Sequence, residues 1–393
     1  MINFTRLLCG VAQPADPLRY GVGRGAPRTA AERKPIVVWN ITRSCNLRCI
    51  HCYSDSLPRA FPGELTRKEC RSLIEDLASF GVPGLLLSGG EPLIHRSFFE
   101  IASHAREYGL PLTLSTNGTL ITPRVATKLR DIGFAYVGIS LDGIGATHDK
   151  FRGSSGAFER SVAAFRNCRA VGQKVGLRLT LTSYTVSDLD RILDFIETES
   201  IDRVCFYHLV YSGRGINLSL LGPEKTRQAL DKIIDRVESW HRRGPSPEVL
   251  TVGQPADGPY LLMHLAKEYS ERKALALELL KWNGGGNHGS GVGIANIDTQ
   301  GNVHPDQFWQ THTLGNVRQT PFSRIWQESN DTILRGLRTR PRPVGGRCAL
   351  CRFLDLCGGG FRVRACQRFG DPWREDPGCY LTDQEISSDF AAA

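Results

Sequence analysis

Three cysteines, Cys45, Cys49 and Cys52, stand in a C-x3-C-x2-C spacing shortly after the apolar run of residues 36–39. Three thiolates this close together can bind one soft metal centre. A cubane iron–sulfur cluster ordinarily takes four cysteines, so a cluster held by these three alone would leave one iron open to a small molecule. The apolar run indicates a buried strand. We therefore expect a metal-binding loop at the mouth of a folded core.

A zinc site is the alternative interpretation of the same spacing. A structural zinc takes a fourth ligand, and His51 is the neighbouring side chain that could provide it. His51 stands between Cys49 and Cys52, however, where its ring has little room to reach a shared ion. The spacing alone leaves both metals open and favours the iron–sulfur cluster.

The length and composition of the chain are those of a globular protein. Its 393 residues exceed one typical domain and suggest about two. No apolar run approaches the roughly 20 residues that cross a bilayer, so we expect a cytoplasmic protein that does not bind membranes. The net charge of +9 weakly indicates acidic partners. Because the chain has no polybasic block and no nucleic-acid motif, we expect no nucleic-acid partner.

The cysteines fall into two groups. Twelve cysteines in a chain expected in a reducing compartment argue against a disulfide framework. The second group lies between residues 348 and 379, and four scattered cysteines are expected to be small buried hydrophobic residues. The second group is Cys348, Cys351, Cys357, Cys366 and Cys379, and the scattered residues are Cys9, Cys70, Cys168 and Cys205.

Apolar runs alternate with helical patterns between residues 35 and 210. This alternation indicates parallel strands joined by crossover helices, in an open sheet or a curved barrel. Ligands of both architectures bind at the carboxyl ends of the strands. The expected strands are 36–39, 85–87, 111–114, 136–139, 175–181 and 204–209, and the expected helices are 67–80, 98–108, 123–132, 158–171 and 189–197.

Short motifs stand at these strand ends. In the motif 88–92, two glycines would let the backbone approach a ligand, and Glu91 or nearby carbonyl groups could accept hydrogen bonds from an ammonium group. The small polar residues of 115–118 and 140–143 suit ribose hydroxyls or a carboxylate, although ordinary turns use the same residue types. Arg178 stands in an apolar strand and therefore needs an anion, either a ligand or an internal acid.

In their order and placement, the cysteine loop and these motifs resemble the radical SAM superfamily. The resemblance implies an α/β fold with a partial (β/α)6, TIM-like barrel over residues 35–210. It also implies a 4Fe-4S cluster on Cys45, Cys49 and Cys52, with S-adenosylmethionine on the open iron. The implied cofactor contacts are Tyr53, Gly89, Gly90, Glu91, Pro92, Ser115, Asn117, Ser140, Asp142 and Arg178.

The remaining segments are less regular. Residues 1–34 are rich in glycine and proline and are expected to form a loose arm, with a short helix at its start. Helical patterns occur at 223–243 and 258–282. One loop lies between them and another follows the second, and these loops could cover a site or simply connect neighbouring elements. A β-hairpin is expected over 295–306 and a helix over 322–337.

The second cysteine group resembles the SPASM/twitch extension of radical SAM enzymes. From the residues alone, four thiolates suit either zinc or a second iron–sulfur cluster. The resemblance implies an auxiliary 4Fe-4S cluster on Cys348, Cys351, Cys357 and Cys379, with Cys366 outside it. The chain has Asp306 and Phe361 where the full SPASM pattern has cysteines. We therefore expect two clusters in total, and Asp306 in place of Cys379 is the lesser alternative.

Further segments resemble the NirJ family of haem d1 biosynthesis. They include 136–143, 295–298, 303–306, 340–348 and 370–381. The resemblance implies a 5′-deoxyadenosyl radical that removes two propionate side chains from didecarboxysirohaem, and a flavodoxin or ferredoxin as reduced electron donor. Candidate partners for the substrate's carboxylates are Arg152, Arg178 and Arg214, and candidate axial or acid–base groups are His208, His288 and His304. The expected domains are an arm (1–34), a core (35–215), a helical connection (216–290) and an auxiliary-cluster domain (291–393).

Three other functions stay open at this point. One is a SPASM-type maturase acting on a peptide, for which the arm 1–34 looks too short to bind a leader. Another is the related enzyme that decarboxylates acetate arms in alternative haem synthesis. The third, from another class, is a zinc-binding scaffold protein. Colour separates the last from the others, because iron–sulfur proteins are brown and zinc proteins are colourless.

Overall fold

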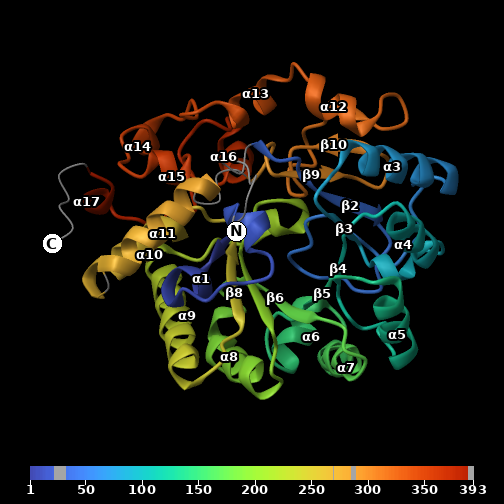
Figure 1. The fold of residues 1–393 in the computed structure, drawn as a ribbon, viewed down its shortest axis with the longest axis horizontal. Coiled ribbons are helices and arrows are strands. Elements are labelled where there is room, and N and C mark those ends of the chain that lie inside the picture. Colours follow the sequence, from blue (N-terminus) through green and yellow to red (C-terminus); the bar gives the residue numbers. More distant parts are fainter. Residues whose placement is uncertain (22–31, 269, 285–288, 388–393) are drawn as a thin grey trace.

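The computed structural model describes residues 1–21, 32–268, 270–284 and 289–387. One sheet of eleven strands runs through these residues, in the spatial order β1-β8-β7-β6-β5-β4-β3-β2-β9-β10-β11 (Figure 1). The strands are β1 (Ile2–Asn3), β2 (Ile36–Thr42), β3 (Leu85–Gly89), β4 (Leu112–Thr116), β5 (Tyr136–Ser140), β6 (Val175–Leu181), β7 (Arg203–His208), β8 (Glu248–Val252), β9 (Ile294–Ile297), β10 (Asn302–His304) and β11 (Gly315–Asn316).

The strands β2 to β8 pair in parallel and alternate with helices. The sequence predicts β2 to β7 within two or three residues, and β8 extends the parallel set by one. The expected (β/α)6 core is therefore confirmed. Its helices are α3 (Arg67–Phe80), α4 (Phe98–Glu107), α5 (Pro123–Ile132), α6 (Ala146–Arg152), α7 (Ala157–Ala170) and α8 (Leu189–Thr198).

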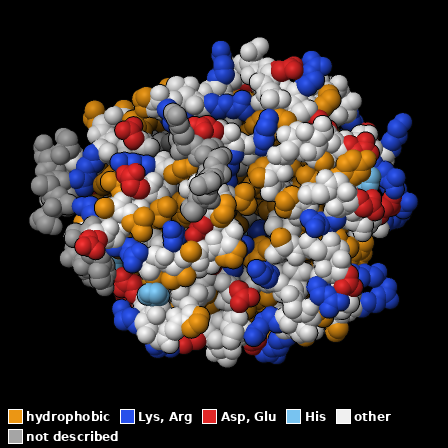
Figure 2. Space-filling view, in the orientation of Figure 1, with side chains coloured by type: hydrophobic (Ala, Val, Ile, Leu, Met, Phe, Trp, Pro, Cys, Tyr) orange, Lys and Arg blue, Asp and Glu red, His pale blue; other side chains and the backbone are white. Residues whose placement is uncertain are grey.

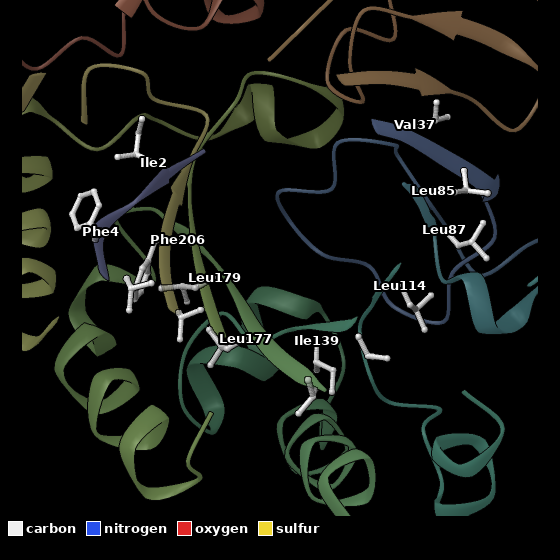
Figure 3. Close-up of a cluster of buried hydrophobic side chains, with 14 of the residues drawn as sticks. Ile2, Phe4, Val37, Leu85, Leu87, Leu114, Ile139, Leu177, Leu179 and Phe206 are labelled. Atoms are coloured by element: carbon white, nitrogen blue, oxygen red, sulfur yellow. The ribbon is translucent and has the colours of Figure 1, made fainter. Parts of the chain in front are cut away.

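The main hydrophobic core includes the apolar side chains of the parallel strands. Val37, Leu87, Leu114, Ile139 and Leu177 are each fully buried, and Figure 3 shows them following one another from strand to strand. Burying each such side chain contributes about 2 kcal/mol. This core fixes the strands, so their carboxyl ends can present polar loops without large shifts in position.

The N-terminal segment is part of this core, which corrects the expectation of a loose arm for residues 1–21. Strand β1 pairs antiparallel with β8, and α1 (Phe4–Cys9) and α2 (Asp16–Tyr20) follow. Phe4 is fully buried and Leu7 is 1% exposed. The composition suggested a loose arm because glycine and proline are concentrated in 21–27, whereas the anchoring residues lie before that stretch.

The C-terminal part continues the same sheet. Strand β9 pairs in parallel with β2, and β10 and β11 add antiparallel strands, which confirms the expected hairpin. The expected helix 258–282 is helical on both sides of residue 269, and the expected helix 322–337 is divided in two. The stretch 322–337 divides because Asp331 caps a new helix, accepting a hydrogen bond from the Leu334 N–H at 2.8 Å. The helices are α9 (Pro223–Arg243), α10 (Asp257–Glu268), α11 (Ser270–Asn283), α12 (Phe322–Glu328), α13 (Thr332–Arg338), α14 (Gly346–Ala349), α15 (Leu354–Cys357), α16 (Arg362–Phe369) and α17 (Asp383–Ile386).

The surface in Figure 2 carries charged groups of both signs, and hydrophobic side chains gather toward the middle of that face around a hollow. None of the described helices combines the length and apolar character that a membrane span requires. The expected domain boundaries stay predictions. The pairing of β9 with β2 means that the segments on either side of residue 291 share one sheet.

Candidate functional site

The cysteine loop leaves the end of β2 and is held against the end of β3. The Gly90 N–H donates to Thr42 O at 2.7 Å, and the Glu91 N–H donates to Ser44 O at 2.9 Å. A Cβ on Gly90 would lie 2.2 Å from Ser44 O, and one on Gly89, whose φ is +137°, would lie 2.3 Å from Thr42 O. Both positions therefore need glycine so that β3 can approach the loop's own backbone.

The three cysteines of the loop pack together in one small cluster of buried side chains. Two polar side chains from distant segments point at their sulfurs. Arg152 Nη1 donates to Cys49 Sγ at 3.5 Å, and Asn117 Nδ2 donates to Cys45 Sγ at 3.9 Å. Cys52 Sγ lies 3.5 Å from a serine hydroxyl in the same loop. Donors around sulfur suit thiolates, the form in which cysteine binds a metal centre.

The free thiols of Cys45 and Cys49 would be protonated at neutral pH. Burial raises the pKa of Cys45 to about 12 and also raises the pKa of Cys49. A cluster or metal ion binding here would displace these protons. Within the described residues, no group of three or more His, Cys, Asp or Glu side chains is arranged to hold a single metal ion.

Glu91 faces inward and supports the site. Its carboxylate accepts hydrogen bonds from the Leu93 N–H at 3.2 Å, the Thr116 hydroxyl at 2.8 Å and the Asn117 N–H at 2.8 Å. The side chain is fully buried, and burial raises the pKa of Glu91 to about 7. With its oxygens occupied in this way, Glu91 joins the ends of β3 and β4. The neighbouring carbonyl groups are then the better acceptors for an ammonium group.

A cavity lies over the carboxyl ends of the parallel strands, on the inner side of the cysteine loop. It gathers side chains from the loop, from β2 to β7 and from the segment after β10. The lining residues are Val38, His51, Tyr53, Leu86, Ser88, Ser115, Ser140, Arg152, Arg178, Thr180, Tyr207, His208, Leu209, Val210, Gln307 and Phe308. Of the expected cofactor contacts, Tyr53, Ser115, Ser140 and Arg178 line this cavity, and the side chains that do not line it are those of Glu91, Pro92, Asn117 and Asp142, together with the glycines Gly89 and Gly90.

Arg178 gives the cavity a buried positive charge. Its Nη1 donates to Ser115 Oγ at 2.9 Å, and its guanidinium carbon lies 5.9 Å from the centre of the Tyr136 ring. No carboxylate among the described residues forms an ion pair with Arg178, and its Nε has no hydrogen-bond partner there. A buried guanidinium in this state is suited to bind an anion that enters the cavity.

A second arginine of the cavity is already paired. Arg152 forms an ion pair with Asp142, whose other oxygen accepts a hydrogen bond from the Thr180 N–H at 2.6 Å. The same guanidinium reaches Cys49, so Asp142 positions it against the cysteine loop. His51 lies 3.9 Å from Asp142, and burial lowers the pKa of His51 to about 4, which keeps its ring neutral.

Tyr53 places a phenol in the cavity next to the loop. Its hydroxyl donates to Asn40 Oδ1 at 3.1 Å and lies 3.3 Å from Ser88 Oγ. Burial raises the pKa of Tyr53 to about 12, so the phenol stays neutral. Its ring meets Phe308 edge to face, with centroids 5.4 Å apart. Phe308 follows β10 and brings the C-terminal region into the cavity wall.

The other candidates for substrate contacts have different surroundings. Arg214 donates to Cys49 O at 2.9 Å and to Ser56 O at 3.1 Å, which braces the cysteine loop from outside the cavity. His208 lines the cavity, and its Nε2 lies 2.9 Å from Asp257 Oδ2. His304 is 1% exposed, and its Nδ1 lies 2.7 Å from the carbonyl oxygen of His312, in the segment after β10. His288 lies outside the described residues.

The second cysteine group forms a separate site. Cys348, Cys351, Cys357 and Cys379 all line one small apolar cavity between α14, α15 and the segment before α17. Burial raises the pKa of Cys379 to about 11 and also raises the pKa of the other three. Four thiols around one void are the donor set of a closed cluster.

The remaining candidates of the C-terminal region do not line this cavity. Cys366 packs against the cluster of Trp309 and Val363. Asp306 is buried and accepts hydrogen bonds from the Ser290 hydroxyl, the Phe308 N–H and the Trp309 N–H. The geometry therefore favours Cys379 over Asp306 as the fourth member of the group.

The residues that the sequence did not single out come mostly from distant segments. Tyr207, Thr180, Gln307 and Phe308 line the cavity without belonging to any motif. The last two stand far from the cysteine loop along the chain, and only the pairing of β9 with β2 brings their segment near. The alternation of β6 and β7 across the two faces of the sheet is the one signal that could have indicated Thr180 and Tyr207.

The sequence is similar to that of proteins with an assigned function over nearly its whole length. The family model of the radical SAM superfamily matches residues 39–196. The Fe-coproporphyrin III synthase of Methanosarcina barkeri is 47% identical, over 98% of this chain and 99% of that protein. The pre-heme d1 synthase of Dinoroseobacter shibae is 46% identical, over 99% of this chain and 94% of that protein.

The fold is similar to that of solved structures. Streptococcus suis SuiB bound to S-adenosylmethionine superposes with a TM-score of 0.66, covering 88% of this chain and 77% of that one at 18% identity. Identity this low supports a common fold and leaves the substrate open.

Proposed function

This chain belongs to the radical SAM superfamily, and from that premise we propose that it removes two propionate side chains from didecarboxysirohaem in haem d1 biosynthesis. As a radical SAM enzyme it uses a 4Fe-4S cluster and S-adenosylmethionine. When bound, these two supply a 5′-deoxyadenosyl radical that abstracts hydrogen from the substrate. The protein's own contribution is to bind, orient and exclude water.

The observation that carries the proposal is that the cysteine loop and Arg178 lie around the same cavity. Cys45, Cys49 and Cys52 would hold the cluster, with Arg152 and Asn117 donating hydrogen bonds to sulfur. Arg178 and Ser115 would bind a carboxylate of S-adenosylmethionine from β6 and β4. The side chains of Tyr53 and Ser140, which line the cavity, would make further cofactor contacts. The backbone of residues 89–92, Asn117 and Asp142 would make the others.

The substrate is proposed from the relatives and from the charge of the chain. A relative named pre-heme d1 synthase is similar over 99% of this chain, a span that covers the segments of both cysteine groups. The chain's net charge is +9, which agrees with a substrate that carries several carboxylates. His208 is the proposed acid–base group beside the substrate, and its ring is hydrogen-bonded to the buried Asp257.

The second cysteine group is proposed to hold an auxiliary 4Fe-4S cluster. Its support is the single apolar cavity that Cys348, Cys351, Cys357 and Cys379 share. This cluster would accept the electron that remains after side-chain loss. The C-terminal residues 291–393 are then an auxiliary-cluster domain, joined to the core 35–215 through the helical connection 216–290.

One anaerobic assay tests the function. Reconstituted, reduced protein is mixed with S-adenosylmethionine and didecarboxysirohaem, and mass spectrometry follows the tetrapyrrole and 5′-deoxyadenosine. Loss of propionate mass in step with 5′-deoxyadenosine is the expected result. Formation of 5′-deoxyadenosine with an unchanged tetrapyrrole would overturn the proposed substrate.

A second candidate reaction is favoured by one specific observation. The Methanosarcina barkeri relative named Fe-coproporphyrin III synthase is 47% identical, slightly more than the pre-heme d1 synthase. The alternative is therefore formation of Fe-coproporphyrin III, as that relative's name states. The assay above separates the two reactions, because Fe-coproporphyrin III and a tetrapyrrole that has lost its propionate side chains differ in mass.

A further inference from the structure

A groove lies on the outer side of the cysteine loop, away from the cavity. Including its open mouth, it encloses about 1450 Å³. Its walls come from the cysteine loop, the segment 58–65, the start of α3 and the residues around η2 (Pro92–Ile94). None of the functions proposed above uses this groove.

The cysteine loop separates the two hollows. Cys45 and its neighbours Ser44 and Asn46 line the groove, whereas His51 and Tyr53 of the same loop line the cavity. The site of the three cysteines is therefore adjacent to both spaces. Because cofactor and substrate would fill the cavity, the groove is the approach that stays open to a partner arriving from solvent.

The groove is positively charged. Arg59, Arg67 and Arg96 line it and are exposed, and Glu64 is the only carboxylate in its lining. The Oε1 atom of Glu64 already accepts hydrogen bonds from the Thr42 hydroxyl at 2.7 Å and the Arg43 N–H at 3.0 Å. Arg67 lies 3.5 Å from Glu100, so Arg59 and Arg96 carry the less compensated charge.

The groove also offers apolar surface between these charges. Ile94 is 37% exposed on its wall, and Phe61 lies beneath the guanidinium of Arg59 at 4.9 Å from the ring centre. An exposed apolar side chain surrounded by cationic groups is typical of a transient interface with an acidic protein.

We propose that this groove docks the electron donor, an acidic one-electron carrier protein, next to Cys45. The inference rests on the proposed function, because it assumes an iron–sulfur cluster on the three cysteines. At this contact one electron leaves the reduced carrier, which is oxidised by one electron, and reduces the cluster site by one electron. No bond forms or breaks in the groove, and no proton has to move there.

The test compares two reductants on the loaded, full-length enzyme. The groove variant is Arg59→Glu/Arg96→Glu, with Arg59→Gln/Arg96→Gln as a milder form. The control variant is Lys225→Glu/Arg242→Glu, which makes the same change of net charge on α9, far from α3 and α4 in Figure 1. Formation of 5′-deoxyadenosine is measured with photoreduced flavodoxin and, separately, with dithionite.

The groove variant should be slowed about tenfold with limiting flavodoxin at low salt, because steered association depends on charge at the contact. The milder variant should be slowed less, and added salt should reduce the difference. With dithionite, all variants should match the wild-type rate and iron content. Equal slowing of the control, or a groove variant as fast as wild type with flavodoxin, would overturn the docking site. Wild-type protein that forms no 5′-deoxyadenosine with dithionite would instead overturn the proposed function, and the docking site with it.

Discussion

The two cysteine sites differ in what surrounds the sulfurs. The N-terminal loop has three cysteines between a polar cavity and a cationic groove, with Arg152 and Asn117 donating toward sulfur. The C-terminal group has four cysteines around a small apolar void. A site with three ligands and two open sides is arranged for exchange with other molecules, and one with four ligands around a mainly apolar void is arranged to stay closed. Similar cysteine chemistry can thus serve two roles because the enclosing elements differ.

Loss of the three-cysteine site should have the largest effect. In Cys45→Ala/Cys49→Ala/Cys52→Ala we expect no detectable 5′-deoxyadenosine and a decrease from about eight to about four iron atoms per chain. Chromatography of the nucleoside and a colorimetric iron assay measure both. A triple variant that still cleaves S-adenosylmethionine would show that the three-cysteine site is not the site of cleavage.

Opening the four-cysteine site should uncouple the reaction. In Cys351→Ala we expect iron content to fall toward that of one cluster, and 5′-deoxyadenosine to form without the matching tetrapyrrole product. The matched control is Cys366→Ala, because Cys366 lies outside the void, and it should retain both products. Full turnover of Cys351→Ala with unchanged iron content would contradict the proposed auxiliary cluster.

Removing the unpaired charge of the cavity should weaken anion binding. Arg178→Met deletes a buried charged hydrogen-bond donor, so we expect affinity for S-adenosylmethionine to fall by roughly 10- to 100-fold. Arg178→Lys keeps the positive charge, so its affinity for S-adenosylmethionine should fall less. Equilibrium dialysis with the loaded protein measures the affinity, and an unchanged value for Arg178→Met would assign this arginine to another anion.

The smallest expected effect is on stability. In Glu91→Gln, an amide N–H₂ replaces one oxygen that accepts a hydrogen bond, most disruptively at the Asn117 N–H. We expect the free energy of unfolding to fall by about 1–3 kcal/mol. Denaturant titration measures it, with Glu100→Gln on the exposed side of α4 as the control that should change little. Equal stability of the two variants would mean that Glu91 does not join β3 to β4.

The sequence predicted the parallel core well because its strands and helices repeat with clear periods. Helix 67–80 is an example, since Thr66 and Glu69 form the capping box that begins it. Local pattern failed where distant contacts decide the structure. Nothing near Ile2 indicates that it pairs with Thr251 of β8.

The same distinction applies to the candidate site. Motif spacing indicated the cysteines, and Arg178 could be identified as a charge in an apolar strand. The inward orientation of Glu91 could not be predicted, because it depends on the Thr116 and Asn117 groups that reach it across the sheet. Phe308 was missed for a similar reason, since its place in the cavity depends on long-range strand pairing.

The pairing of β9 with β2 also determines how the protein tolerates truncation. A chain ending before residue 294 would lose the neighbour of β2 and expose the backbone groups of residues 36–39 along a strand edge. An uncovered edge of this kind is a template for pairing between molecules. Expressing residues 1–293 alone should therefore give self-associating protein, so the C-terminal region would serve as a solubility factor for the catalytic core quite apart from any iron it carries.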